Sequence, residues 1–366
     1  MGNSKNSYLE IDLDKVVENY NYIKGLTNSK VMAVVKANAY GLGIVEIAKV
    51  LKKAGADFFG VAFYEEAIKL IKSGIKEKIL IFNYIKKEYL NKLININNII
   101  ITIYSIEQLN GYIDYMGDNI NKLKIHLKVN TGLDRLGIRE EDLNIAIKLI
   151  KKYNLKIEGI YSHFANASGN EGYTRFQDNN FNKIIKKFEE NNILFRVKHI
   201  SNSAATLLYR KFDYDYVRVG MAIYGLQPLE EYNNNIKEVL TLKSIISGVF
   251  NVKKGENIGY GLKTAALKNM KIAIIPIGYS DGYLFQLSSK GLVEINGIEC
   301  NIVGEVCMDQ IIVDVSKIEN LKIEDEVIVI GGKIGINRLA KIVDTIPDEI
   351  LCKLSNSLEK NYIGDV

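Results

Sequence analysis

The stretch VMAVVKANAYGLGIVEIAKVLKKAGADFFGVA, residues 31–62, contains the pattern that decides the fold. It opens with the apolar run Val31–Val35 and closes with a second one, Phe58–Ala62. Between them, Ile44–Lys53 carries apolar residues at spacings of three and four. Such runs are typical of strands buried on both faces, and the intervening spacing is that of an amphipathic helix. The stretch therefore predicts a strand, a helix and a second, parallel strand.

The same alternation continues to about residue 220. The further runs that predict strands are Ile79–Phe82, Ile99–Ile103, Leu123–Val129, Ile157–Ser162, Val197–Ile200 and Tyr216–Val219. Helical periodicity recurs in Tyr64–Lys72, Leu143–Lys152 and Thr174–Glu190. Eight strands separated by helical segments favour an α/β fold of the closed (β/α)8 TIM-barrel type over an open sheet. No GxGxxG follows the first strand, which argues against a dinucleotide-binding sheet.

Shorter β-like runs with glycine-containing turns follow after about residue 236. They are Leu240–Phe250, Lys271–Ile277, Leu292–Ile295, Ile311–Val315 and Glu326–Ile330. Few segments look helical before Arg338–Ile346. A barrel routinely takes up about 250 residues, so a chain of 366 has room for one barrel and a smaller domain. We predict a barrel in residues 1–235 and a C-terminal mainly-β domain in residues 236–366.

Composition and charge exclude several classes of protein. The 48 basic and 43 acidic residues leave a net charge of +5, and no basic cluster is interleaved with aromatic residues, so nucleic-acid binding is not expected. The three cysteines lack CxxC spacing, which argues against a disulfide framework or a zinc site. No apolar run approaches the ~20 residues of a membrane helix, and the first residues lack a secretion signal. We expect a cytoplasmic protein without a metal.

Lys36 follows directly after the apolar strand Val31–Val35. Burial of an ammonium group lowers its pKa, and a neutral amine can attack an aldehyde. In a barrel, active sites form at the C-terminal ends of the strands. The alternative is that Lys36 simply emerges into solvent at the end of the strand.

Two later segments carry small residues at the last strands of the barrel. HISNSAAT, residues 199–206, places Asn202 and Ser203 at the start of a helix, and VRVGMAIYG, residues 217–225, places Arg218 just before Gly220. Unpaired backbone N–H groups at this position commonly hold phosphate. A helix cap and a tight turn would explain the same residues without a ligand.

Eight motifs occur in the order found in alanine racemases, and together with the opening YLEIDLDKVVENY they span nearly the whole chain. They are KANAYG, TGLDRLG, YSHFANAS, HISNSAAT, VRVGMAIYG, IGYG, IGYSDGY and CMDQ. The chain thus resembles the alanine racemase family. The resemblance implies a barrel followed by a β domain, a head-to-tail homodimer with shared active sites, and interconversion of L- and D-alanine with pyridoxal 5'-phosphate, supplying D-alanine for cell-wall synthesis.

The resemblance also implies a role for each matching residue. Lys36 resembles the lysine that holds the cofactor as a Schiff base, and Arg218 the residue that faces the pyridine nitrogen. A guanidinium can only donate, so that nitrogen would stay unprotonated, which weakens the ring as an electron sink and suppresses side reactions. The residues that match the rest of the cofactor site are Tyr40, His163, Asn202, Ser203, Gly220, Met221 and, by position, Asn356.

Racemisation through the cofactor's external aldimine requires a base on each face of the substrate carbon. Lys36 resembles one base, and Tyr260 of the partner subunit resembles the other. An ordinary phenol with a pKa near ~10 is a poor base, and cationic neighbours would lower that pKa; His163 and Arg218 resemble members of such a network.

Four residues resemble the substrate-binding set. Arg135 matches a ligand of the substrate carboxylate, and Met308 would bind the same group through its backbone N–H across the dimer interface. Lys128 matches a position that is often carbamylated, and a carbamate there could orient Arg135. Tyr279 resembles a residue at the substrate entrance.

Two positions depart from the family pattern. Leu42 stands where relatives commonly have histidine, and Asn356 stands where a tyrosine gates the pocket if Cys352 is in register; Tyr362 fills that place if the register slips. Asparagine is smaller and can hydrogen bond, so L-serine is a second expected substrate. The remaining alternatives are a serine-preferring racemase, a decarboxylase on a similar barrel, a non-catalytic cofactor-binding regulator, and a class I aldolase that uses Lys36 alone.

Overall fold

The computed structural model describes residues 6–229, 231–354 and 358–365. Eight parallel strands form one sheet in the order β8-β7-β6-β5-β4-β3-β2-β9. Their bounds are β2 Lys30–Val34, β3 Phe58–Val61, β4 Lys78–Ile81, β5 Ile99–Ile103, β6 Lys124–Lys128, β7 Lys156–Tyr161, β8 Val197–His199 and β9 Tyr216–Val219. Backbone N–H groups of Asp215 and Arg218 donate to the carbonyls of Lys198 and Ser201 and bring β9 against β8. The sheet is therefore a nearly closed barrel, and the predicted fold class is confirmed.

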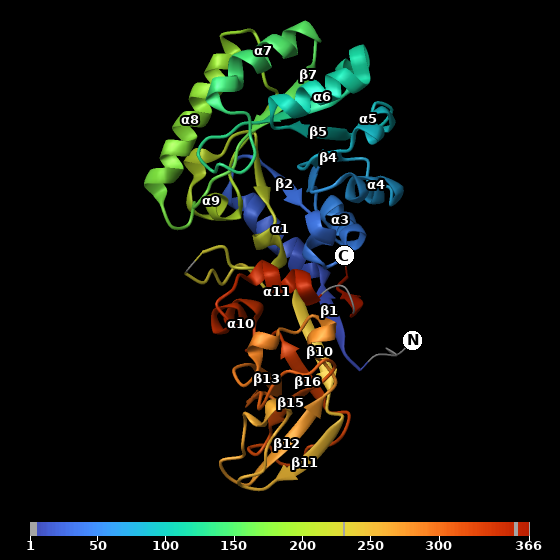
Figure 1. Cartoon of the computed structure of the whole chain (residues 1–366), viewed down its shortest axis with the longest axis vertical. Helices are drawn as coiled ribbons and strands as arrows, with labels where there is room; N and C mark the ends of the chain where they lie inside the picture. The colour runs from blue at the N-terminus through green and yellow to red at the C-terminus, as the bar shows by residue number, and fades with distance from the viewer. Residues whose placement is uncertain (1–5, 230, 355–357, 366) are drawn as a thin grey trace.

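Helices cover the outside of the barrel (Figure 1). They are α1 Leu13–Leu26, α3 Ile44–Lys53, α4 Tyr64–Lys72, α5 Lys87–Leu93, α6 Ile106–Met116, α7 Leu143–Lys152, α8 Glu171–Glu189 and α9 Ser203–Leu208. In α3, the residues Ile44, Ile47, Ala48 and Leu51 are buried, as its spacing predicts. Short 3-10 turns join several elements: η1 Gly117–Lys122, η2 Glu140–Asp142, η3 Arg210–Phe212 and η4 Met221–Tyr224.

The C-terminal region holds two sheets, drawn at the bottom of Figure 1. Their strands are β10 Leu240–Ile245, β11 Gly248–Val252, β12 Met270–Ile275, β13 Leu292–Ile295, β14 Ile298–Asn301, β15 Ile311–Asp314, β16 Glu326–Ile330 and β17 Glu359–Ile363. Between the strands lie η5 Tyr260–Leu262, η6 Tyr279–Asp281 and η7 Phe285–Leu287, and near the end α10 Ile336–Ile342 and α11 Pro347–Leu354. The helix α10 overlaps the predicted helical segment Arg338–Ile346, and α11 is a second helix that the sequence did not predict.

The first strand of the chain does not belong to the barrel. β1, Tyr8–Asp12, lies between β10 and β17 in the sheet β14-β13-β16-β10-β1-β17. Its alternating burial, with Leu9 and Ile11 inside, is that of a strand in a sheet with one face covered. The predicted division at residue 235 remains a prediction, but residues 8–12 pair with the second region.

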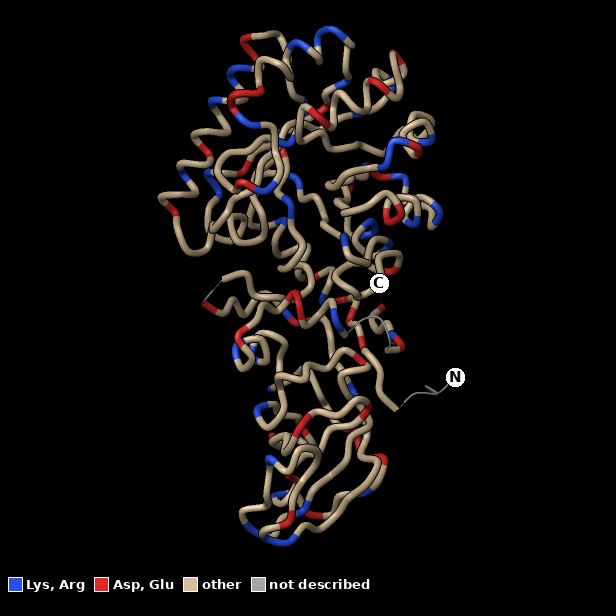
Figure 2. Tube along the Cα trace, in the orientation of Figure 1, with Lys and Arg blue, Asp and Glu red and all other residues tan. Residues whose placement is uncertain are grey.

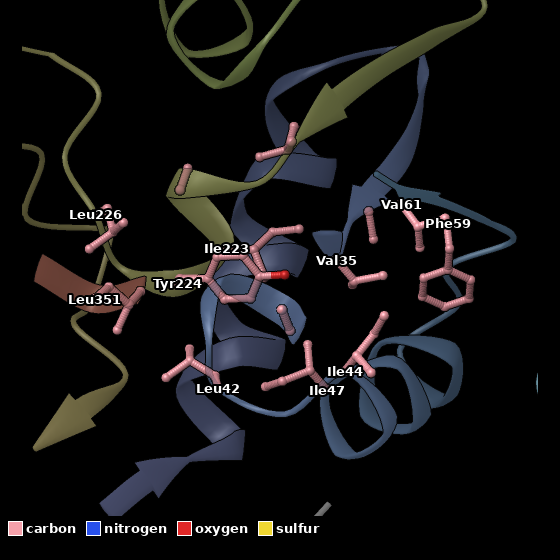
Figure 3. Close-up of a cluster of buried hydrophobic side chains, with 14 of the residues drawn as sticks. Val35, Leu42, Ile44, Ile47, Phe59, Val61, Ile223, Tyr224, Leu226 and Leu351 are labelled. Carbon is pink, nitrogen blue, oxygen red and sulfur yellow. The ribbon is translucent and has the colours of Figure 1, made fainter. Parts of the chain in front are cut away.

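Two apolar clusters make up the core. The interior of the barrel is filled by Met32, Phe58, Leu80, Ile100, Tyr161, Val197 and Tyr216. A larger cluster lies between the barrel and its helices and continues into the second region. Figure 3 shows part of it, with the Tyr224 ring among Leu42, Ile223 and Leu351. This packing seats α11 against the segment that follows Lys36.

Basic and acidic residues are both dispersed along the described parts of the chain (Figure 2). No helix in the described parts of the chain is both long and apolar enough to cross a membrane.

Candidate active site

A left-handed turn follows Lys36 at the end of β2. Ala37, Asn38, Ala39 and Tyr40 have φ between 53° and 56°, a conformation that costs an L-residue roughly 1–2 kcal/mol. Glu66 offsets part of this cost by accepting the backbone N–H of Asn38 at 3.0 Å. Strain of this kind persists where the surrounding structure enforces it, commonly at functional sites. Here the turn places Lys36 and Tyr40 on the same cavity.

The cavity has a volume of about 700 Å³ and lies at the C-terminal ends of the barrel strands. Such a volume suits a cofactor and a small substrate. Ten of the residues expected from the sequence line it: Lys36, Tyr40, Lys128, Arg135, His163, Asn202, Ser203, Arg218, Gly220 and Met221. Residues that are up to 185 positions apart in the chain thus share one site.

Positive charge dominates the lining of the cavity. Lys36, Lys128, Arg135 and Arg218 face it, and Asp348 is the single carboxylate among the lining residues that the structure describes. Burial, with the neighbouring cations Arg218, Arg135 and Lys36, lowers the pKa of Lys128 to about 8. Burial raises the pKa of Asp348 to about 6, although Lys36 opposes this shift. The excess of cations suits a ligand that carries phosphate and carboxylate groups.

Arg218 is held from behind by neutral acceptors. Its NH1 donates to Nδ1 of His199 at 2.8 Å, and its NH2 lies within 3.1 Å of the Ser162 and Ile200 carbonyls and of His163 Nδ1. No acceptor for its Nε–H occurs among the described residues, so this donor remains for a ligand. Burial lowers the pKa of Arg218 to about 10, which leaves it charged at neutral pH.

His163 is neutral in this arrangement. Burial, followed by the charges of Arg218 and Lys128, lowers the pKa of His163 well below its usual value. His163 was expected to belong with Arg218 to a cationic network; of these two residues, only Arg218 carries positive charge in the structure. With its Nδ1 turned to the guanidinium, His163 presents an Nε2–H donor instead.

Gly220, Ser203 and Tyr40 form a cradle that fits a phosphate group. The N–H of Gly220 donates to Oγ of Ser203 at 3.3 Å, and a Cβ on Gly220 would lie 2.5 Å from the Tyr40 hydroxyl. Only glycine therefore lets the backbone approach Tyr40 so closely. Burial raises the pKa of Tyr40, so its hydroxyl stays protonated and can donate. The donors and the nearby cations match the chemistry of a phosphorylated pyridine aldehyde.

Three expected residues lie outside this cavity, on the C-terminal region. Tyr260, Tyr279 and Met308 are exposed, at 69%, 45% and 59%. Exposure is what a residue that reaches into a partner subunit requires, and these three roles stay predictions.

The gate position is only partly described. Asn356 lies outside the described residues. Tyr362 lies on β17, where its hydroxyl donates to the Leu42 carbonyl at 2.8 Å, and it does not line the cavity. Leu42 itself is fully buried in the apolar core, which accounts for an apolar residue at that position.

Among the lining residues that the sequence did not indicate, Tyr161 and Asp348 bear most directly on the chemistry of the site. Tyr161 ends β7, stacks on His199 with ring centroids 4.8 Å apart, and lies under the Arg218 guanidinium. Its place at a strand end, inside a quoted motif, could have indicated it. Asp348 lies in the first turn of α11. Acidic residues are common there on exposed helices, so the sequence held no signal that this one is buried.

No group of three or more histidine, cysteine, aspartate or glutamate side chains in the described chain could hold a metal ion.

Known proteins match both the barrel and the C-terminal region of the chain. The family model "Alanine racemase, N-terminal domain" matches residues 11–228, and "Alanine racemase, C-terminal domain" matches residues 239–362. The chain is 38% identical to an alanine racemase of Methanococcus maripaludis, over 97% of this chain and 98% of that protein.

Solved structures agree. An alanine racemase of Clostridium difficile 630 superimposes with a TM-score of 0.92 at 34% identity, covering 99% of this chain and 97% of that one. An alanine racemase of Bartonella henselae with covalently bound pyridoxal phosphate superimposes with a TM-score of 0.90 at 28% identity, covering 98% of this chain and 100% of that one.

Proposed function

The chain belongs to the alanine racemase family, and on this premise we propose that it interconverts L- and D-alanine with pyridoxal 5'-phosphate, supplying D-alanine for cell-wall synthesis in the cytoplasm. The observation that carries the proposal is the gathering of ten residues expected from the resemblance around one cation-rich cavity. When bound there, the cofactor supplies a ring that delocalises the electron pair left on Cα when its proton departs.

Lys36 is the residue that holds the cofactor covalently. Arg218 donates to the pyridine nitrogen, and its remaining Nε–H and its neutral supports suit that task. Because a guanidinium has no acceptor, Arg218 would leave that nitrogen unprotonated when the cofactor is bound, which would limit transamination. The phosphate is held by Tyr40, Asn202, Ser203 and the backbone of Gly220 and Met221.

Arg135 binds the substrate carboxylate, together with the backbone N–H of Met308 of the partner subunit, and Tyr279 lies at the entrance. Lys128 is carbamylated in this proposal. Its pKa of about 8 leaves part of the amine neutral near pH 7–8, and only the neutral amine can add to carbon dioxide. The resulting anion would orient Arg135 and offset part of the positive charge.

Two bases exchange the α-proton. Nζ of Lys36 takes or returns it on one face of Cα, and Oη of Tyr260 of the partner subunit acts on the other. The Nε2–H of His163 can donate to that oxygen and so stabilise its anionic form, while Arg218 contributes charge.

Because the two bases come from different subunits in this proposal, the active protein is a dimer. Tyr260 is 69% exposed, and two large apolar side chains that follow it in the chain are also exposed, Leu262 at 76% and Leu267 at 87%. Contact with a partner barrel would remove them from water.

Complementation between two inactive variants tests the shared site. Lys36→Ala and Tyr260→Phe, refolded together, form mixed dimers in which one of two sites has both bases intact. About a quarter of the wild-type activity should return, since half the dimers are mixed. If the mixture stays as inactive as its parents while mixed dimers are present, the second base does not come from the partner.

Exchange in deuterated water tests the reaction itself. L-Alanine should lose optical rotation while deuterium appears at Cα, and Lys36→Ala should lose both this exchange and the visible absorption of the bound cofactor. A decarboxylase would release carbon dioxide instead, and an aldolase would show no such absorption. Tyr260→Phe should keep the absorption and lose exchange in at least one direction.

Serine is the proposed second substrate. An asparagine side chain is smaller than that of tyrosine, and its amide could hydrogen bond to a hydroxymethyl group if Asn356 fills the gate position; such a contact can discriminate strongly. The ratio of kcat/KM for L-serine to that for L-alanine should fall in Asn356→Tyr. An unchanged ratio would refute this extension but not the alanine activity.

A further inference from the structure

Two of the chain's three histidines, His163 and His199, contact Arg218 directly, and the third contacts His199. Beyond His199, on the side away from the cavity, lies His126 of β6. Its Nδ1 is 3.0 Å from Nε2 of His199, whose own Nδ1 is 2.8 Å from Arg218 NH1. Both rings are fully buried. A continuous line of hydrogen bonds therefore runs from the cavity into the barrel interior.

Counting donors along this line defines the position of each proton. Arginine only donates, so Nδ1 of His199 must accept and its proton must reside on Nε2. That N–H then donates to Nδ1 of His126, whose proton resides on its Nε2 in turn. Burial lowers the pKa of His126 to about 3 and that of His199 well below its usual value, so both rings are neutral. Each imidazole is thus restricted to one tautomer.

The presence of His126 in the barrel interior requires local changes that are unfavourable for stability. The β6–β7 pairing shifts register between Ile125 and His126, so that His126 lies opposite Gly159. A Cβ on Gly159 would lie 2.6 Å from Cε1 and Nε2 of the imidazole, and only glycine leaves this space. Nε2 of His126 has no partner among the described residues, and a buried donor without a partner is unfavourable. A leucine would fill such a position without this penalty.

We propose that His126 is a positioning residue for Arg218. By accepting the Nε2–H of His199, it holds that imidazole in the tautomer that presents a bare Nδ1 to the guanidinium. Without His126, the Nε2–H of His199 has no acceptor in the dry interior. The other tautomer would set an N–H against the N–H of Arg218. Either outcome disturbs the guanidinium, and with it the contact to the pyridine nitrogen under the proposed function.

Nitrogen NMR of the holoenzyme labelled with 15N-histidine tests this directly, because only three histidines contribute signals. We expect His126 and His199 to be neutral Nε2–H tautomers that do not titrate between about pH 6 and pH 9. A His199 signal with its proton on Nδ1, or a charged His199, would overturn the proposal without reference to activity.

Substitutions provide the second test. His126→Leu should change the His199 signal, shift the absorption band of the bound cofactor and lower kcat for alanine about tenfold, with a smaller change in KM. His126→Asn, whose amide oxygen can accept in place of Nδ1, should restore much of each property. Leu80→Ala is the matched control, because Leu80 is fully buried in the same barrel interior but makes no polar contact. It should lower the melting temperature and leave the His199 signal and the absorption band as they are.

The outcomes separate the proposal from the proposed function. If His126→Leu keeps the His199 signal, the absorption band and kcat of the wild type, the positioning role is refuted. The same holds if Leu80→Ala reproduces every change. If instead the wild type does not exchange the α-proton of alanine, the proposed function fails, while the NMR signals and the absorption of bound cofactor still report on the line of imidazoles.

Discussion

Asp348 should destabilise the folded protein at neutral pH, and Asp348→Asn should relieve this. The carboxyl faces the cavity, and its buried Oδ1 has no hydrogen-bond partner among the described residues. Burial raises its pKa from 3.8 to about 6. At about 1.36 kcal/mol for each pH unit by which the pKa is raised, this change lowers the free energy of unfolding by about 3 kcal/mol when the carboxyl is ionised.

The sign follows from proton binding. Between about pH 4 and pH 6 the folded state binds more protons than the unfolded state, so stability falls as pH rises through that window and levels off above it. Removing the ionisable group should therefore raise the free energy of unfolding by up to about 3 kcal/mol above pH 7, and by about half as much at pH 5. Loss of a carboxylate from the first turn of α11 opposes this by about 0.3–1 kcal/mol, so the net gain remains positive.

Equilibrium urea unfolding of cofactor-stripped protein at equal concentrations measures the effect, since cofactor binding would otherwise contribute. Glu349→Gln is the matched control. Glu349 is the next residue of α11, and its carboxylate pairs with Lys353 at 2.7 Å, so its loss should not stabilise the protein. Equal stability of Asp348→Asn and wild type at pH 8 and pH 5 would show that the carboxyl is not desolvated as the structure implies.

Three further predictions follow from the site. Gly220→Ala would place a Cβ 2.5 Å from the Tyr40 hydroxyl; by displacing one phosphate donor it should weaken pyridoxal-phosphate binding about tenfold, measured by absorbance titration. Glu66→Gln removes a charged acceptor from the N–H of Asn38 at 3.0 Å and should lower stability by about 2 kcal/mol in urea unfolding; an unchanged midpoint would show that the left-handed turn holds without it. Incubation with 13C-bicarbonate should give a carbamate resonance that Lys128→Ala lacks, and its persistence in that variant would assign it to another amine.

Local sequence was sufficient to predict the barrel. A strand buried on both faces must be almost wholly apolar. Runs such as Ile99–Ile103 are of this kind, because their exposure to water would be unfavourable. From the residues alone, Lys36, Ser203 and Arg218 could be placed together, because parallel strands bring their carboxyl ends to one end of the barrel. The other cavity residues were expected from the resemblance to the family.

Other features depended on contacts between distant residues. Nothing in Tyr8–Asp12 distinguishes a barrel strand from one that pairs with β10 and β17, because strand pairing is a choice among partners far away in the chain. The burial of Asp348 depends on the packing of α11 beside Lys36. The proposed positioning role of His126 depends on its hydrogen bond with His199 and on the space beside Gly159. Residue types and their local order determined the strands and the chemistry available; only tertiary structure decided which polar groups lose water and which atoms then satisfy them, because desolvation and hydrogen bonding act between neighbours in space.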